Sequence, residues 1–283
     1  TGAPVLCFDP THKHALNDPA VWVSQGYRPM FQRFFKALEK DHPETCHSTE
    51  ENAEPYLNLF DGYMIWRCTD AAQIPVFQSI YSGRVQFVGR LFNHVRPGDY
   101  QSFFSKIGQQ LVNAEQLGWF PIFDMYDNDA RRLFVKKAMH VRLALLRWFN
   151  EGKRIKSPDF GGTMPEEKSL WGGMRPQIVT MPQIANSAWI DKSGNRMWLF
   201  ANTQNKSVRA VPSVKSNQKI WQCREDFSVP QLLKNPSVEL QPHSFEIRVE
   251  NDYELAVQIQ KTLSRIAKFD AGLPVRRFVK QKT

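Results

Sequence analysis

The sequence of 283 residues predicts a mixed chain, an α/β part with a parallel sheet followed by an antiparallel β-sandwich. Three observations predict this class. Apolar runs and helical stripes alternate up to about residue 150, which is typical of an α/β layer or barrel. Residues 151–176 are rich in Gly, Pro and charge, as in a linker. Short segments without helical periodicity follow. We therefore predict two domains, residues 1–165 and 166–283.

The elements of the first part follow from local signals. A capping side chain and a proline in Asn17-Asp18-Pro19 predict a helix start, and the helical stripe that follows ends before His42-Pro43. The apolar runs 63–66 and 76–81 predict buried strands. Two further helical stripes are expected, at 103–114 and, behind an Asn128 cap, at 134–148.

The elements of the second part are predicted mainly from turn signals and alternation. Strands are expected at 197–201, 207–214 and 244–250, because apolar residues alternate there between Gly- and Asn-rich turns. A final amphipathic helix is expected from about Asp252 to Phe269. These patterns together predict the antiparallel domain.

Composition limits the class of protein. A chain with 42% hydrophobic residues can bury a core, which excludes a disordered tail or a collagen-like repeat. No stretch approaches the roughly 18–20 uncharged apolar residues of a membrane-spanning helix, so we expect a soluble chain without a membrane partner. The four cysteines show neither CxxC spacing nor a metal-ligand pattern.

The net charge of +9 is unevenly distributed. Residues 1–150 hold 16 basic and 15 acidic side chains, whereas residues 151–283 hold 21 and 13. The basic segment 261–283 contains only two aromatic residues, so a solvated tail is expected rather than a nucleic-acid site. The alternative is a basic interaction protein whose binding to a polyanion depends strongly on salt.

Carboxylates are concentrated between two predicted strands. Glu50 ends the short segment 46–50, Glu51 and Glu54 follow it, and Asp61 precedes the next apolar run. Residues just past the carboxyl ends of parallel strands line active sites, and crowding there separates carboxyl pKa values, as acid/base chemistry requires. The alternative is an acidic cluster that caps a helix start. The neighbouring aromatic residues fit a core better than a sugar platform.

Two further segments carry polar groups suited to a ligand. His12 and His14 share one loop, but an isolated His-x-His lacks a third and fourth ligand, so we predict no metal. Hydrogen bonding to a polar substrate or a structural loop role is expected instead. Glu115 and Trp119 combine an acid and an aromatic ring in a pattern suited to sugar hydroxyls, although Gly118 could simply end the preceding helix.

Several of these motifs together resemble a known family. They are Cys-Phe-Asp-x-x-His-x-His at 7–14, Thr49-Glu50 with Ala53-Glu54-Pro55-Tyr56, Phe60-Asp61-Gly62-Tyr63, Glu115-Gln116-Leu117-Gly118-Trp119, and Met197-Trp198-Leu199-Phe200-Ala201-Asn202. In order and spacing they resemble bacterial glycoside-hydrolase-like TIM-barrel proteins, many of them known only as a domain of unknown function and related to the α-galactosidase type.

The resemblance implies a fold and an organisation. It implies the C-terminal part of a (β/α)8 TIM barrel, followed by an antiparallel β-sandwich. A complete barrel needs about 250 residues, and only about 150 precede the predicted sandwich, so we expect the C-terminal portion of a longer enzyme. The sequence leaves localisation and oligomeric state open.

The resemblance also implies a function. It implies a carbohydrate substrate and no cofactor, with Glu50 as one of the two carboxylates that glycosidases use and Asp61 and Glu54 as the next candidates. The implied hydroxyl-binding residues are Asp9, His12, His14, Trp66, Glu115 and Trp119. The alternative function is a catalytically inactive carbohydrate-binding protein that keeps these residues for recognition.

Overall fold

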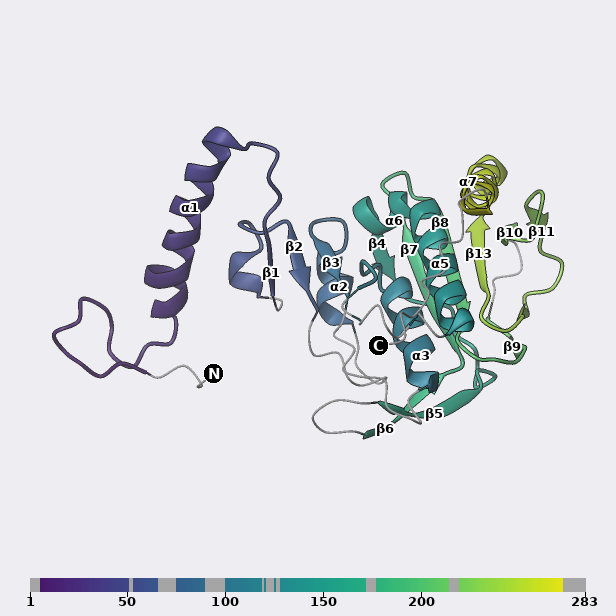
Figure 1. Ribbon diagram of the computed structural model, residues 1–283, viewed down its shortest axis with the longest axis horizontal. Helices are drawn as coiled ribbons and strands as arrows, with labels where there is room; N and C mark the ends of the chain where they lie inside the picture. The colour runs from purple at the N-terminus through teal and green to yellow at the C-terminus, as the bar shows by residue number, and fades with distance from the viewer. Residues whose placement is uncertain are drawn as a thin grey trace, which may run out of the picture. The chain divides into compact units, whose positions relative to one another are not determined.

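The computed structural model describes residues 6–50, 53–65, 75–89, 100–118, 120, 125, 128–171, 177–213 and 219–271 (Figure 1). The chain forms two compact units, Thr1–Met64 and Ile65–Thr283. The predicted domain boundary near residue 165 falls inside the second unit. Within the described ranges, no helix is both long and apolar enough to cross a bilayer.

The first unit consists of one long helix and two short parallel strands. α1 ends directly before His42, as predicted, but regular α-helix starts later than Pro19 because the π-helical segment η1 comes first. β1 and β2 pair in parallel, with Ser48 beside Gly62 and Glu50 beside Met64. The elements are η1 (Trp22–Tyr27), α1 (Arg28–Asp41), β1 (Ser48–Glu50), η2 (Glu54–Tyr56) and β2 (Gly62–Met64).

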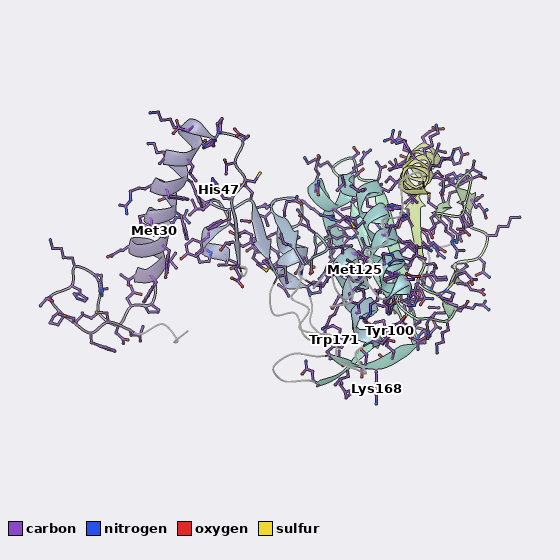
Figure 2. All side chains as sticks on the ribbon, viewed as in Figure 1. Met30, His47, Tyr100, Met125, Lys168 and Trp171 are labelled. Carbon is purple, nitrogen blue, oxygen red and sulfur yellow. The ribbon has the colours of Figure 1, made fainter. Side chains whose placement is uncertain are left out.

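Aromatic rings join α1 to these strands. Phe31 and Phe35 of α1 meet the Phe60 ring edge-on, at centroid distances of 5.1 and 5.3 Å. His47, labelled in Figure 2, stacks on Phe35 at 3.8 Å. Phe60 and Tyr63 are buried. The aromatic residues near Glu50 therefore form the core of this unit, as the core interpretation predicts.

The first described element of the second unit is a helix, where the sequence predicts a strand. Residues 76–81 form α2 (Val76–Tyr81), in which the Phe77 and Tyr81 rings lie one turn apart, 4.8 Å between centroids. Gln78 is buried on this helix and donates a hydrogen bond to Glu115. The predicted strand is therefore wrong. A short apolar run is compatible with a buried strand and with a buried helical turn, so the sequence pattern could not distinguish them.

The later helices follow their predicted stripes, except that the stripe at 134–148 is divided between two helices that meet at Leu145. The cap at Asn128 is confirmed, because its side chain accepts a hydrogen bond from the Arg131 amide at 3.0 Å. Ala114 lies beyond α3 with a φ of +61°, a left-handed conformation that ends this helix before Gly118. The elements are β3 (Gln86–Val88), α3 (Tyr100–Val112), α5 (Asp129–Ala144), α6 (Leu146–Glu151) and α7 (Tyr253–Ala271).

The described strands of the second part pair antiparallel, as the sequence predicts. A six-stranded sheet has the order β11-β10-β13-β8-β7-β4, and β12-β9 and β5-β6 form two separate pairs. The strands are β4 (Lys153–Ile155), β5 (Glu166–Trp171), β6 (Gln177–Pro182), β7 (Ile184–Ile190), β8 (Arg196–Asn202), β9 (Val208–Ala210), β10 (Ile220–Cys223), β11 (Gln231–Leu232), β12 (Val238–Leu240) and β13 (Phe245–Glu250).

The six-stranded sheet is buried on both faces. Alternate residues of β8 point to opposite sides, so Met197 and Leu199 join the core beneath α3, α5 and α7 (Figure 1). Trp198 and Phe200 face the other way and pack with residues of β9 and β12. Helices 100–151 thus share one core with the sheet. The change in composition at 151–176 marks a change from helix to strand and does not divide the core.

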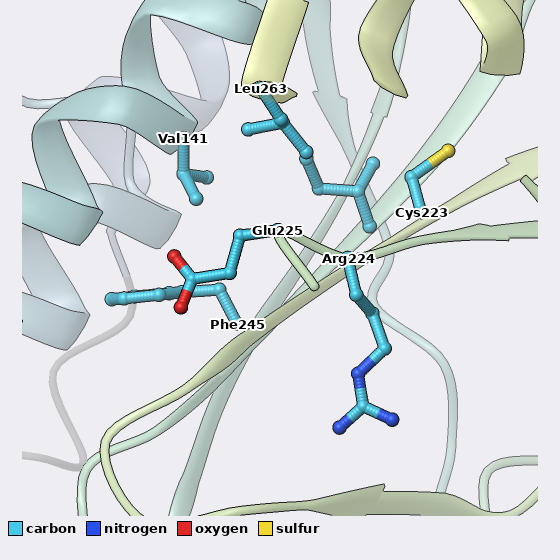
Figure 3. A pocket seen from close by; sticks show the side chains of 7 residues that line it. Val141, Cys223, Arg224, Glu225, Phe245 and Leu263 are labelled. Atoms are coloured by element: carbon cyan, nitrogen blue, oxygen red, sulfur yellow. The ribbon is translucent and has the colours of Figure 1, made fainter. Parts of the chain in front are cut away.

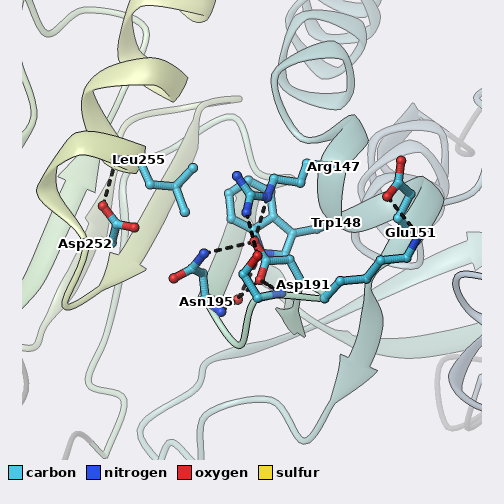
Figure 4. Close-up of polar contacts among 9 residues, drawn as sticks. Arg147, Trp148, Glu151, Asp191, Asn195, Asp252 and Leu255 are labelled. Atoms are coloured by element: carbon cyan, nitrogen blue, oxygen red, sulfur yellow. Dashed lines mark hydrogen bonds and ion pairs between the residues drawn. The ribbon is translucent and has the colours of Figure 1, made fainter.

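A polar network closes the turn between β7 and β8 (Figure 4). The Asp191 carboxylate accepts hydrogen bonds from the amides of Ser193 and Asn195, both at 2.9 Å, and forms an ion pair with Arg147 at 2.6 Å. Burial alone would raise the pKa of Asp191, but these hydrogen bonds and the Arg147 charge outweigh burial and lower it. The network fixes α6 against the sheet, because Trp148 also donates to the Asn195 carbonyl.

Candidate functional site

Glu50 is the last residue of β1 and is exposed. Because β1 and β2 run parallel, Glu50 lies at the carboxyl end of this strand pair, level with Met64. Within the described ranges, no hydrogen bond or ion pair engages its carboxylate. A carboxylate at the carboxyl end of a parallel strand, open to solvent, is placed as active-site acids are in α/β enzymes.

Asp61 lies at the opposite end of the same strand pair. It directly precedes β2, and its carboxylate accepts a hydrogen bond from the His47 amide at 2.8 Å. The register places Asp61 beside His47, three residues from the level of Glu50, which corresponds to about 10 Å along the strands. Asp61 therefore closes the amino end of the strand pair, away from Glu50.

Glu54 is exposed and begins η2, the single turn that follows β1. It occupies the first turn, where a carboxylate interacts favourably with the unpaired backbone amides. The neighbouring Pro55 is held in place, because its carbonyl accepts a hydrogen bond from Arg28 at 2.5 Å. Glu54 is thus an exposed acid in the first turn of η2, four residues after Glu50 in the chain.

The loop before η1 gathers a second set of polar side chains. Asp9 accepts hydrogen bonds from the Thr11 hydroxyl and amide at 2.7 and 2.8 Å, and these bonds lower the pKa of Asp9. His12 contacts Cys7 through Nδ1, at 3.0 Å from the thiol sulfur, and faces Asp9 through Nε2, at 3.5 Å. The His14 ring lies 5.4 Å from that of His12, measured between centroids.

The structure therefore brings three predicted residues of the first unit together, Asp9, His12 and His14 in the loop. Glu50 lies apart from them at the carboxyl end of β1, and Asp61 lies at the other end of the strand pair. The loop and β1 lie on opposite sides of α1 in Figure 1. Cys7 joins the loop group through its contact with His12, which the sequence did not predict. Its spacing to the two histidines within one loop is the signal that could have identified it.

Glu115 is fully buried in the second unit. Its carboxylate accepts a hydrogen bond from Gln78 at 2.9 Å, and its charge also acts on Arg154. Burial lowers the pKa of Arg154 to about 10, an effect that the Glu115 charge opposes. Glu115 immediately precedes Gln116, which bridges in parallel to Val88 of β3. A buried carboxylate held in this way supports the packing of α2.

Trp66 and Trp119 lie outside the described residues. One pocket of the second unit is seen in Figure 3, between α5, α7 and the strands β10 and β13. Its lining is mostly apolar and includes Glu225, which forms an ion pair with Lys137. The pocket has room for no more than about one water molecule, so it does not accommodate a sugar.

Residues 1–94 match a family model described as "Domain of unknown function (DUF6259)". Among solved structures, an α-galactosidase I from Mortierella vinacea superposes with a TM-score of 0.47 at 11% identity, covering 81% of this chain and 63% of that one. A β-L-arabinopyranosidase from Geobacillus stearothermophilus gives a TM-score of 0.45 at 9% identity, covering 80% and 54%.

Two curated proteins are similar in sequence. "Putative glycoside hydrolase" of Bacteroides thetaiotaomicron is 25% identical over 210 residues, which are 72% of this chain and 30% of that protein. "Putative glycoside hydrolase 22789" of Monosiga brevicollis is 30% identical over 216 residues, 66% of this chain and 18% of that protein. The chain thus spans less than a third of the length of either relative. In sequence, it is glycoside-hydrolase-like.

Proposed function

We propose that this chain contributes to a glycoside hydrolase and acts on a carbohydrate by carboxylate acid/base chemistry. The observation that supports this most is the position of Glu50, exposed at the carboxyl end of a parallel strand in a chain similar to glycoside hydrolases. In this proposal Glu50 protonates the leaving glycosidic oxygen, or binds the substrate directly, while a second carboxylate acts as nucleophile or base.

The mechanism requires a second carboxylate near Glu50. The two acids of glycosidases lie about 5–10 Å apart, whereas Asp61 is about 10 Å from Glu50 along the strands alone and is engaged by His47. Glu54, four residues after Glu50, is the better candidate in this chain. We also propose that the complete protein can supply this acid from residues outside the chain, since the curated relatives are several times longer.

The same proposal includes a fold. Parallel pairing of β1 with β2 supports residues 1–165 as part of a (β/α)8 barrel. The antiparallel sheet packed against the β12-β9 pair supports a sandwich for residues 166–283. The exposed loop group would then bind sugar hydroxyls. We assign that role to Asp9, His12 and His14 and, by the sequence resemblance, to Trp66 and Trp119. We no longer assign it to Glu115, which is buried.

The test is a hydrolysis screen of the chain on aryl-glycosides, α-galactosides included, with Glu50→Gln as the variant. We expect turnover to fall by at least about 100-fold in Glu50→Gln, because a general acid contributes that much, while substrate binding changes little. Glu44→Gln is the matched control, because Glu44 is also exposed and lies just before β1. Equal losses of turnover and binding in Glu50→Gln would contradict the catalytic assignment.

The second candidate function is a catalytically inactive carbohydrate-binding protein. The observation that favours it is the engagement of Asp61 at the far end of the strand pair, which leaves Glu50 without that partner. This function predicts no hydrolysis by well-folded protein together with measurable heat of binding to an oligosaccharide. Hydrolysis that Glu50→Gln abolishes would exclude it.

A further inference from the structure

The loop between Cys7 and Asn17 gathers three metal-ligating side chains. One potential ligand atom each from Cys7, His12 and His14 lies within 4.8 Å of the other two. The loop is closed at its base, because the Asn17 amide donates to the Cys7 carbonyl at 2.9 Å. Asn17 adopts a φ of +53° there, a left-handed conformation that Asn tolerates better than most residues. The three groups are thus held by one short, closed segment.

Hydrogen bonding selects which ring nitrogen of each histidine is available. His14 Nδ1 lies 2.9 Å from the Ala15 carbonyl, which can only accept, so Nδ1 carries the proton and Nε2 keeps a lone pair. His12 Nε2 faces the Asp9 carboxylate at 3.5 Å, which favours the proton on Nε2 and leaves the Nδ1 lone pair toward the Cys7 thiol. Metal-binding histidines usually show this arrangement, with the second nitrogen donating to a carboxylate or a backbone carbonyl.

We propose that Cys7 Sγ, His12 Nδ1 and His14 Nε2 bind one divalent metal ion of the zinc type. One thiolate and two imidazoles suit Zn²⁺, and three protein ligands leave a fourth tetrahedral position for water or a ligand. Binding replaces the Cys7–His12 hydrogen bond, and the thiol proton is released to solvent as the sulfur–metal bond forms. Asp9 is a positioning residue in this site, because it orients His12 without contacting the metal.

This inference goes beyond the proposed function: it replaces the prediction that no metal binds, and it makes His12 and His14 metal ligands in place of direct partners for sugar hydroxyls. That prediction rested on the absence of a third and a fourth ligand beside His-x-His, and Cys7 supplies the third. The proposal does not depend on hydrolysis, because its test uses metal binding alone. A chain that fails to hydrolyse any glycoside can still confirm it.

The experiment is a titration of the chelator-treated, reduced full chain with Co²⁺, followed by absorption spectroscopy. We expect one equivalent to produce a near-ultraviolet thiolate-to-cobalt band and the visible bands of tetrahedral cobalt, and an equivalent of Zn²⁺ to displace them. Cys7→Ser should abolish the near-ultraviolet band. His14→Ala should weaken binding at least tenfold. Asp9→Asn should weaken binding about 10- to 100-fold while keeping the band, since it removes only an outer partner.

The matched controls are Cys46→Ser and His42→Ala, which change an exposed cysteine and an exposed histidine of the same unit. Both should bind cobalt like the original chain. Circular dichroism of each variant shows whether it is folded. Absence of a thiolate band in the folded original chain would overturn the proposal. So would a band that persists unchanged in Cys7→Ser, or one that disappears in Cys46→Ser.

Discussion

Two helices of similar length, one in each unit, differ strongly in how many of their residues are buried. α1 of the first unit has 14 residues, none of them buried, whereas 11 of the 13 residues of α3 in the second unit are buried. The first unit carries Glu50 and the Cys7–His14 loop, and the second carries the large shared core. The difference teaches that the stability of this chain and its proposed chemistry lie in different parts of the sequence.

The largest effect is expected at the buried pair of β13. Arg248 donates to Glu246 at 2.6 Å and to the carbonyls of Pro236 and Ser237 at 2.7 Å, and both charged side chains are fully buried. Arg248→Met leaves Glu246 charged without this partner and should lower the free energy of unfolding by about 3–5 kcal/mol. Urea denaturation measures it. Arg209→Met is the control, because Arg209 is exposed. Equal losses of unfolding free energy in both variants would contradict the view that the buried core provides the stability.

A cavity at the centre of the sheet should cost nearly as much. Leu199 of β8 is fully buried beneath the helices. Leu199→Ala should lower the free energy of unfolding by about 2–5 kcal/mol, because apolar contacts are lost and a cavity remains. Leu232→Ala makes the same chemical change on β11, where the side chain is 47% exposed. Thermal unfolding measures both variants, and Leu199→Ala must lose clearly more free energy of unfolding than Leu232→Ala.

The turn at Asp191 gives a smaller effect that depends on pH. The pKa of Asp191 is lowered in the folded chain, so its contribution is fully present above the unfolded value of about 3.9 and is lost as pH falls through the folded value. Asp191→Asn should cost about 1–3 kcal/mol at pH 7 and progressively less below about pH 4. Denaturation curves at several pH values test this. Asp226→Asn, at an exposed carboxylate, is the control and should cost clearly less than Asp191→Asn at pH 7.

The smallest effect is expected in the first unit. Phe34 on α1 is 56% exposed, so Phe34→Ala should change the free energy of unfolding by no more than about 0.5 kcal/mol. Differential scanning calorimetry measures it against Leu199→Ala. A loss as large as that of the core variant would show that α1 is buried in the folded protein and would break the comparison between the units.

Long, strongly periodic elements were predictable from the sequence. α3, α5 and α7 follow their apolar stripes, and the alternation of β13 is confirmed by its placement in the core. The strand predicted at 76–81 is wrong, because a short apolar run fits a buried strand and a buried helical turn equally well. The hydrogen bond from Gln78 of this helix to Glu115 joins residues 37 positions apart. No local pattern carries that information.

The candidate site was predictable only in part. The position of Glu50 at a strand end follows from local sequence, and the structure agrees. The engagement of Asp61 by His47 depends on strand register, which the sequence alone does not fix. The contact between Cys7 and His12 depends on loop closure at Asn17, a residue that the sequence suggested only as part of a helix start.

The two strands at the margins of the six-stranded sheet are unusually short. β11 has two residues and β4 has three, while the strands between them have four to seven. An outer strand of this length presents few free amide and carbonyl groups to another molecule. The sheet is therefore a poor template for edge-to-edge aggregation, and its apolar β7 and β8 segments are protected from forming fibrils as long as the sheet stays folded.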